Sequence, residues 1–471
     1  MLGNIDLSSL NIPLSYPFAF LIAVAIVLLL CSGFLKFHRT FYMATSSLSL
    51  IVSVFLILNN IAAQGLEAKG FLGTLNNDIV SLYASLVILC FSFLYLLMQK
   101  EENQGEFYSL FLFMVAGLLL MVSSSNLILI FIGLESSSLA LYTLIAMRGS
   151  NNAISSAIKY FSVAAVGSGF FVMASALIYI RTGTLDLGLK LALDKDPMLL
   201  GAGVMIFVLC AIKLSLAPFH FWLKDVYSSA HVNLVAFISV VPKIAMFVVV
   251  IRLFSFLNHL GFENILNVLA VFSMLVAALA ALSQKDVKKM FAYSSIVHSS
   301  FVLAACIPLL NAADDVLNSI FVYWVLFGFA NYGVFLILST FKGSSFEEFN
   351  ALLFKKPLIA LSLSFCILSL AGIPPFGAFW GKVMVLKTLI VADYWYLALF
   401  MALASLIMLY AYLKLVIHAL FVKTQAKVSE HLNFIQSFIL ALCTLISVFA
   451  LFYTHFLAHE TEAILVFLLL L

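Results

Sequence analysis

The chain has 471 residues, of which 64% are hydrophobic and 10% are charged, whereas a soluble domain is about half apolar and about a quarter charged. This much apolar surface cannot be hidden inside a soluble globule, so the composition excludes a soluble protein and predicts an integral membrane protein. The net charge of +3 comes from 24 basic and 21 acidic residues, a balance that argues against nucleic-acid binding.

Apolar stretches long enough to cross a bilayer recur along the whole chain. A spanning helix needs about 20 mostly apolar residues, and the runs here are continuous rather than alternating, which favours helices. We therefore predict an all-α polytopic membrane protein, with a final stretch, Ala463–Leu471, too short to cross. The expected spans number fourteen in chain order: 14–35, 41–62, 76–98, 107–124, 126–147, 157–180, 199–222, 232–256, 262–282, 287–308, 316–341, 358–391, 394–422 and 434–457.

The flanking charges predict how the chain is oriented in the membrane. No lysine or arginine precedes the first apolar segment and no A-x-A pattern follows it, so it does not look like a signal peptide. Connections after odd-numbered spans carry thirteen lysines and arginines, and those after even-numbered spans carry five. By the positive-inside rule this places the odd connections in the cytoplasm and both termini on the opposite side.

Similar sequence features recur in the two halves of the chain. Glu135-Ser-Ser in span five parallels His298-Ser-Ser in span ten, and spans seven and twelve each combine a lysine with a proline break. Five spans separate the members of each pair, which indicates two inverted five-helix repeats, spans 4–8 and 9–13. The expected organisation is a single membrane domain, 1–471, made of an N-terminal three-helix segment, the two repeats, and a C-terminal helix with its tail: 1–98, 107–256, 262–422 and 434–471.

Five ionisable side chains stand out well inside the predicted spans, because an ionisable residue near mid-membrane costs about 2.5–3.5 kcal/mol and indicates function. They are Glu135 in span five, Lys213 in span seven, Lys243 in span eight, His298 in span ten and Lys382 in span twelve. One buried ion pair, Glu135 with Lys213, could simply hold helices together, and His298 alone could be a packing residue. A single carboxylate does not account for the other lysines, so the set favours a proton relay.

Prolines near two of these lysines predict interrupted helices. Pro218 lies in span seven, and Gly372-Ile-Pro-Pro lies in span twelve. Proline removes a backbone donor and clashes with the preceding turn, and paired broken helices in two halves of a transporter often mark an ion path. A simple kink is the alternative reading.

The sequence offers no ligand set for a redox centre. Six cysteines lie far apart in apolar stretches without a CxxC spacing, and there is no GxxxxGK[ST] or GxGxxG motif. We therefore expect no metal and no cofactor in this chain, and buried free thiols instead.

The stretches that contain these charged residues and prolines, from Gly133-Leu-Glu135 to Gly381-Lys382, resemble the antiporter-like proton-translocating subunits of respiratory complex I. These subunits are related to multisubunit cation/proton antiporters. The resemblance runs from span five to span twelve. Within this family, the lysine in span twelve and the lack of a long C-terminal lateral helix resemble the subunit N group. The stretches that carry it are Gly133-Leu-Glu135, Ala157-Ile-Lys159-Tyr-Phe, Lys213-Leu-Ser-Leu-Ala-Pro-Phe-His-Phe-Trp222, Val241-Pro-Lys243, Gln284-Lys-Asp-Val-Lys-Lys, Ala292-Tyr-Ser-Ser-Ile-Val-His298, Ala371-Gly-Ile-Pro-Pro and Gly381-Lys382.

This resemblance implies a translocase subunit of an NADH–quinone oxidoreductase in a bacterial inner membrane. It makes Glu135 with Lys213 the input-side pair, Lys243 the central relay, His298 part of the connecting chain and Lys382 the terminal proton site. Flavin, iron–sulfur clusters and quinone are expected in partner subunits, and the expected partners are the other membrane subunits and lipid, with no nucleic acid.

One stretch departs from the family pattern. After Trp222 the chain reads Leu-Lys224-Asp-Val-Tyr-Ser-Ser-Ala-His231, without the prolines and glycine usual there, so Lys224 and His231 are expected to be solvated loop residues. A subunit of a cation/proton antiporter or of a membrane-bound hydrogenase, a purely structural scaffold, and quinone reduction by this chain itself stay open as alternative functions.

Overall fold

The computed structural model describes residues 10–35, 37–99, 104–187, 196–257, 262–311, 316–424 and 431–459. The C-terminal stretch that was expected to be too short to cross, Ala463–Leu471, lies outside these residues.

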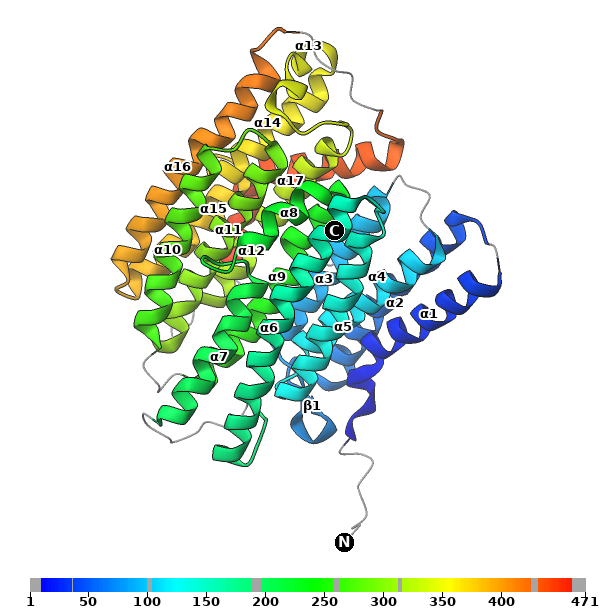
Figure 1. The fold of residues 1–471 in the computed structure, drawn as a ribbon, viewed down its shortest axis with the longest axis vertical. Coiled ribbons are helices and arrows are strands. Elements are labelled where there is room, and N and C mark those ends of the chain that lie inside the picture. Colours follow the sequence, from blue (N-terminus) through cyan, green and yellow to red (C-terminus); the bar gives the residue numbers. More distant parts are fainter. Residues whose placement is uncertain are drawn as a thin grey trace. The chain divides into compact units, whose positions relative to one another are not determined.

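Seventeen α-helices make up most of the described chain (Figure 1). Four short 3-10 helices join them. The α-helices are α1 (Tyr16–Phe34), α2 (Arg39–Gln64), α3 (Ile79–Met98), α4 (Gly105–Val122), α5 (Leu127–Ala146), α6 (Asn151–Thr182), α7 (Pro197–Lys213), α8 (Phe221–Ser229), α9 (Val232–Leu257), α10 (Glu263–Leu282), α11 (Val287–Cys306), α12 (Val316–Leu338), α13 (Leu352–Lys355), α14 (Pro357–Ala371), α15 (Gly377–Val391), α16 (Trp395–Leu420) and α17 (Phe434–His459). The 3-10 helices are η2 (Ile12–Ser15), η3 (Phe71–Gly73), η5 (Ile307–Asn311) and η6 (Phe346–Phe349).

Eleven helices in the described part of the chain are long and apolar enough to cross a membrane. They coincide with eleven of the predicted windows. The windows at spans seven, twelve and fourteen hold shorter apolar helices instead, namely Pro197–Lys213, Pro357–Ala371 and Phe434–Ala450. A polytopic helical membrane protein is therefore confirmed.

Side chains at the helix ends explain why several helices begin where they do. Asp78 caps α3 in a capping box, in which its carboxylate accepts from the Ser81 amide (2.7 Å) and Ser81 Oγ accepts from the Asp78 amide (3.0 Å). Asn126 caps α5, Ser150 caps α6 and Asp286 caps α11 more simply, each with a side-chain oxygen that accepts from one backbone amide of the first turn. Such caps satisfy amides that have no partner within the helix.

Contacts divide the chain into two compact units, and each is described by itself. The first comprises Met1–Cys210 with Ile244–Gly261, and the second comprises Ala211–Lys243 with Phe262–Leu471. In the first unit α4 packs against α1 and α5, and α6 packs against α5. In the second, α12 packs against α14, α15 and α17, while α10 packs against α11 and α16. The apolar windows of α11 and α12 are 100% buried, so these two helices form the interior of the second unit.

A small hairpin and an extra helix depart from the sequence prediction. Strands β1 (Ala68–Gly70) and β2 (Leu75–Asn77) pair antiparallel between α2 and α3, in a connection too short and polar to show a periodic pattern. The expectation that Lys224 is a loop residue was wrong, because Lys224 lies half-buried in α8. His231 lies between α8 and α9 and is half-buried rather than fully solvated.

An ion pair joins distant segments of the first unit. The guanidinium of Arg252, on α9, donates to the Asp78 carboxylate (3.1 and 3.3 Å) and to the carbonyl oxygen of Ser124. Arg252 thereby connects the end of α9 to the start of α3 and to the turn between α4 and α5. Buried guanidinium groups require such partners.

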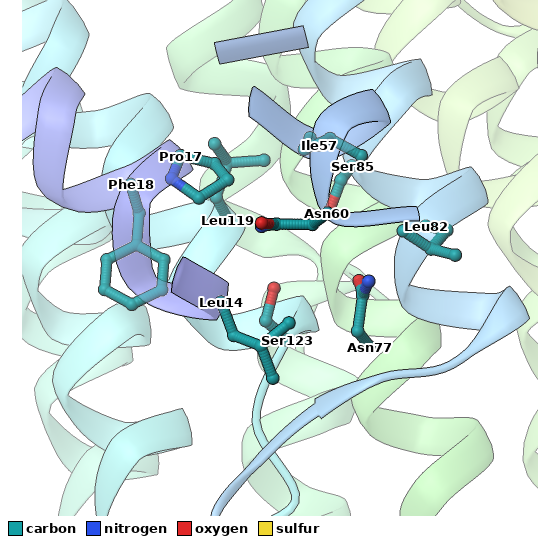
Figure 2. Close-up of a pocket in the computed structure, with 10 residues that line it drawn as sticks. All are labelled: Leu14, Pro17, Phe18, Ile57, Asn60, Asn77, Leu82, Ser85, Leu119 and Ser123. Atoms are coloured by element: carbon teal, nitrogen blue, oxygen red, sulfur yellow. The ribbon is translucent and has the colours of Figure 1, made fainter. Parts of the chain in front are cut away.

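A cavity of about 20 Å³ lies in the first unit. This volume is sufficient for one water molecule. Figure 2 shows Asn77 and Ser123 turning their polar ends toward Asn60 across this space. None of the five ionisable side chains predicted as the site lines the cavity.

Candidate functional site

Glu135 is positioned by a close approach of two helices in the first unit. A Cβ added to Gly133 would lie 2.6 Å from the carbonyl oxygen of Gly117, and a Cβ on Gly117 would lie 2.7 Å from that of Gly133. Paired glycines therefore allow the backbones of α4 and α5 to touch, as small residues do between membrane helices. Two residues after Gly133, the Glu135 carboxylate accepts a hydrogen bond from Ser168 Oγ on α6. The sequence analysis missed Ser168, since a serine in a helix carries no signal of its partner.

Lys213 is the last residue of α7, where the predicted break in span seven occurs. The chain leaves the helix there and resumes helical structure at Phe221. Side chains of other helices satisfy the backbone groups that the break releases: the Ala217 amide donates to Ser273 Oγ (3.0 Å), and Trp222 Nε1 donates to the Ile212 carbonyl (3.3 Å). These two contacts pair one amide and one carbonyl at the interruption, and the break between α7 and α8 confirms the prediction.

Glu135 belongs to the first unit and Lys213 to the second. Their pairing stays a prediction.

Lys243 is held entirely by one neighbouring helix. It follows Pro242 inside α9 and is 2% exposed. Its ammonium donates to the Ser295 carbonyl (3.0 Å), Ser295 Oγ (2.7 Å) and Ser299 Oγ (2.8 Å), all on α11. An ammonium has three donors, so these three acceptors satisfy it without a carboxylate.

His298 lies on the same helix, three residues after Ser295, and is 1% exposed. Both ring nitrogens bind tyrosine hydroxyls: Nδ1 that of Tyr323 on α12, and Nε2 that of Tyr412 on α16 (3.0 Å). The Tyr412 hydroxyl also binds Ser294 Oγ. Neither tyrosine could be predicted as a partner of His298, because a tyrosine in an apolar run looks like an ordinary core residue.

Lys382 lies on α15, directly after the second break, and is 5% exposed. Its ammonium donates to the carbonyls of Leu370 (3.0 Å) and Ala371 (2.9 Å) at the end of α14. Both carbonyls are unpaired within their own helix because α14 stops at Ala371, and the C-terminal end of a helix attracts a positive charge. The Phe301 ring lies 5.8 Å from the Lys382 ammonium and adds a weak cation–π contact.

Two glycines make room around Lys382. Gly372 ends α14 with φ of +82°, and a Cβ there would lie 2.9 Å from both Cδ and Nζ of Lys382. A Cβ on Gly381 would lie 2.6 Å from Cα of Tyr323 on α12. The break in span twelve is closed by Ser369, whose Oγ accepts from the Ala378 amide (3.0 Å). The predicted break is therefore confirmed here too.

Chemically, the second unit places three proton-exchanging groups, Lys243, His298 and Lys382, among hydroxyls and backbone carbonyls. Such groups can take up and release protons, whereas they offer nothing for electron transfer. Within the described residues no three histidine, cysteine or acidic side chains are grouped to hold a metal ion.

Three comparisons place the chain among known proteins. A family model described as NADH:quinone oxidoreductase/Mrp antiporter, transmembrane, matches residues 124–408. The NADH-quinone oxidoreductase subunit N of Campylobacter jejuni (strain RM1221) is 73% identical over 458 residues, covering 96% of this chain and 99% of that protein. The subunit N of Helicobacter hepaticus is 38% identical, with 95% and 96% covered.

Solved structures share the fold. A chain in respiratory complex I from Thermus thermophilus with bound aureothin superposes with a TM-score of 0.83 at 26% identity, covering 95% of this chain and 99% of that one. A chain of the Mrp complex from Dietzia sp. gives 0.84 at 16% identity, covering 96% and 97%, a likeness of fold alone. The present chain therefore belongs to the NADH:quinone oxidoreductase/Mrp antiporter transmembrane family, and within it to the subunit N proteins of NADH-quinone oxidoreductase.

Proposed function

We propose that this chain is a proton-translocating membrane subunit of complex I, in which buried side chains pass protons while neighbouring subunits reduce quinone. Glu135 and Lys213 form the input-side pair, Lys243 is the central relay, His298 connects it onward, and Lys382 is the terminal site that releases protons to the non-cytoplasmic side. The chain acts with the other membrane subunits of complex I, and flavin, iron–sulfur clusters and quinone belong to partner subunits.

The observation that carries this proposal is the set of partners around Lys382. This side chain is buried, and its ammonium donates hydrogen bonds to two backbone carbonyls at a helix end. A permanent charge without a counter-charge is costly inside a membrane. A side chain that alternates between ammonium and neutral amine suits this place, since the carbonyls stabilise the loaded form and burial favours unloading.

We further propose fourteen spans in two inverted five-helix repeats, spans 4–8 and 9–13, with both termini on the non-cytoplasmic side of the bacterial inner membrane. The interruptions after Lys213 and Ala371 support the repeat, since each lies in the fourth span of its half. The three shorter apolar helices account for spans seven, twelve and fourteen. The excess of lysine and arginine in odd connections supports the orientation.

Substitution of Lys382 tests the proposal in fully assembled complex. Lys382→Ala deletes the loading site, and Lys382→Arg keeps a charge that can hardly be lost. Both should assemble, lose proton pumping in sealed vesicles, and slow tightly coupled turnover. Lys387→Ala, an exposed lysine on the same helix, is the matched control and should pump normally. Wild-type proton-to-electron stoichiometry in Lys382→Arg would refute the assignment.

The rival function, a subunit of a stand-alone cation/proton antiporter, makes a different prediction about partners. The chain should then purify without quinone-site and iron–sulfur subunits. Mass spectrometry of the complex purified through a tag on this chain distinguishes the two.

A further inference from the structure

Three buried hydroxyls and the His298 imidazole form one hydrogen-bonded chain in the second unit, called the hydroxyl chain below. Its four members are Ser294, Tyr412, His298 and Tyr323, joined in this order by hydrogen bonds. They come from three helices, α11, α16 and α12, which contact one another or a shared neighbour in the second unit. All four are at most 2% exposed.

We propose that Tyr412 and Tyr323 are proton-transfer residues, and that the chain Ser294–Tyr412–His298–Tyr323 carries protons from the Lys243 side to the Lys382 side. The proposal rests on the proposed function and adds three residues to it, namely Ser294, Tyr412 and Tyr323.

The donor and acceptor nitrogens of the imidazole fix the direction of hydrogen-bond donation along the hydroxyl chain. A neutral histidine has one donor nitrogen and one acceptor nitrogen, so one tyrosine must donate to His298 while the other accepts from it. When Nδ1 carries the proton, Ser294 donates to Tyr412, Tyr412 donates to Nε2, and Nδ1–H donates to Tyr323. When Nε2 carries it, every one of these bonds is reversed.

Passing one proton converts the first arrangement into the second. A proton arrives at Ser294 Oγ, whose own proton moves to the Tyr412 oxygen. The Tyr412 proton moves to Nε2, the Nδ1 proton moves to the Tyr323 oxygen, and Tyr323 releases its original proton. One proton enters and one leaves, no group keeps a charge, and no electron is transferred. Rotation of the hydroxyls and a turn of the imidazole reset the chain.

The two ends of the chain meet the two lysines through neighbouring residues. At one end, Ser294 precedes Ser295, whose hydroxyl and carbonyl hold the Lys243 ammonium. At the other, the backbone of Tyr323 packs directly on Gly381, the residue before Lys382. In Figure 1, α11, α12 and α15 lie together within the second unit, and the contacts between their residues agree. One end of the hydroxyl chain is thus one residue along the backbone from a group that contacts the Lys243 side chain, and the other end contacts the residue that precedes Lys382.

Removing single hydroxyl oxygens tests this proposal. Tyr323→Phe and Tyr412→Phe keep the ring and interrupt the hydroxyl chain, so the rate of proton pumping should fall about a hundredfold or more, in line with the loss of a positioned proton-transfer group. Pumping is measured in vesicles, with complex content and electron transfer to an artificial acceptor measured in parallel. Tyr332→Phe is the control, because Tyr332 is equally buried on α12 and nine residues away, on the opposite face of a helix with 3.6 residues per turn.

A second measurement separates proton transfer from a purely structural role. Site-specific 3-fluorotyrosine at position 323 keeps shape and hydrogen bonding but makes the phenol more acidic. If the phenol transfers the proton, the pH profile of pumping should shift relative to that of the wild type; a structural role leaves the profile unchanged, which would overturn the proposal. This variant also decides the matter if Tyr323→Phe fails to assemble.

The failure of this inference differs from the failure of the proposed function. Normal pumping in both Lys382→Ala and His298→Phe would refute the proposed function and the hydroxyl chain with it. Loss of pumping in these two variants with wild-type stoichiometry in Tyr323→Phe would refute the hydroxyl chain alone.

Discussion

Gly372 offers a way to disturb Lys382 without changing any group that exchanges protons. It ends α14 with φ of +82°, and a Cβ at this position would lie 2.9 Å from Cδ and Nζ of Lys382. In Gly372→Ala the new methyl group and the ammonium cannot both stay in place. Because the methyl group is fixed to the backbone and the lysine side chain is flexible, we expect the ammonium to withdraw from the carbonyls of Leu370 and Ala371.

The size of the effect follows from these contacts. A residue with a Cβ in the left-handed backbone region raises the free energy of the folded state by about 1–2 kcal/mol, which destabilises the protein. Withdrawal also breaks at least one of the two hydrogen bonds to the ammonium, and a hydrogen bond to a charged group contributes about 1.5–3 kcal/mol. Since 1.36 kcal/mol corresponds to a factor of ten in an equilibrium constant, the ratio of protonated to neutral Lys382 should fall roughly ten- to a hundredfold at the same pH. Pumping should fall accordingly.

The assay compares Gly372→Ala with a glycine that has the same backbone strain and no neighbour. Gly183 ends α6 with φ of +73°, and a Cβ there would meet nothing within 4 Å. Both variants should lose similar stability in thermal unfolding of the detergent-purified subunit, but only Gly372→Ala should lose pumping in vesicles that contain assembled complex. Equal pumping by the two variants would show that the contact with Lys382 has no functional consequence.

Three further changes test other parts of the structure. Gly133→Ala forces α5 away from α4 and should destabilise the subunit by about 1–3 kcal/mol, as overpacking does; an unchanged unfolding temperature would contradict the close approach. Arg252→Gln should cost about 1–3 kcal/mol, given that a hydrogen bond to a charged group contributes about 1.5–3 kcal/mol and that the Asp78 side chain, 41% exposed, is partly screened by solvent. The double variant that also carries Asp78→Asn should lose less stability than the sum of the losses in the two single variants. The hydrogen bond from Arg181, with that from a backbone amide, holds the pKa of Asp196 below its ordinary value. The stability that the ionised Asp196 carboxylate contributes to the folded state is therefore present above about pH 4 and is lost as the pH falls through the lowered pKa. The protection factors for hydrogen exchange at the start of α7, which correct for the intrinsic pH dependence of exchange, should therefore fall below that pH relative to neutral pH, and Asp196→Asn should remove this dependence.

Local chemistry made a large part of the fold predictable. Long apolar runs can only be helices in a bilayer, because each backbone polar group must find its partner within its own segment. A proline inside a helix removes a hydrogen bond and clashes with the preceding turn, so the interruptions before Phe221 and Gly377 were expected from Pro218 and the Pro374-Pro375 pair, whereas Pro242 lies inside the continuous helix α9. The short hairpin between α2 and α3 and the helix α8 escaped prediction, since neither is long enough for a periodic pattern.

The sequence by itself determined which residues are too costly to bury without a function: Glu135, Lys213, Lys243, His298 and Lys382 stand out because a charge in an apolar span is expensive wherever it lies. Only the tertiary structure decided what each of them contacts. The partners of Lys243 are 52 to 56 residues away and those of His298 are 25 and 114 residues away. Hydrogen bonds over such separations depend on which helix faces meet, and the identity of a serine or a tyrosine does not reveal which helix it packs against.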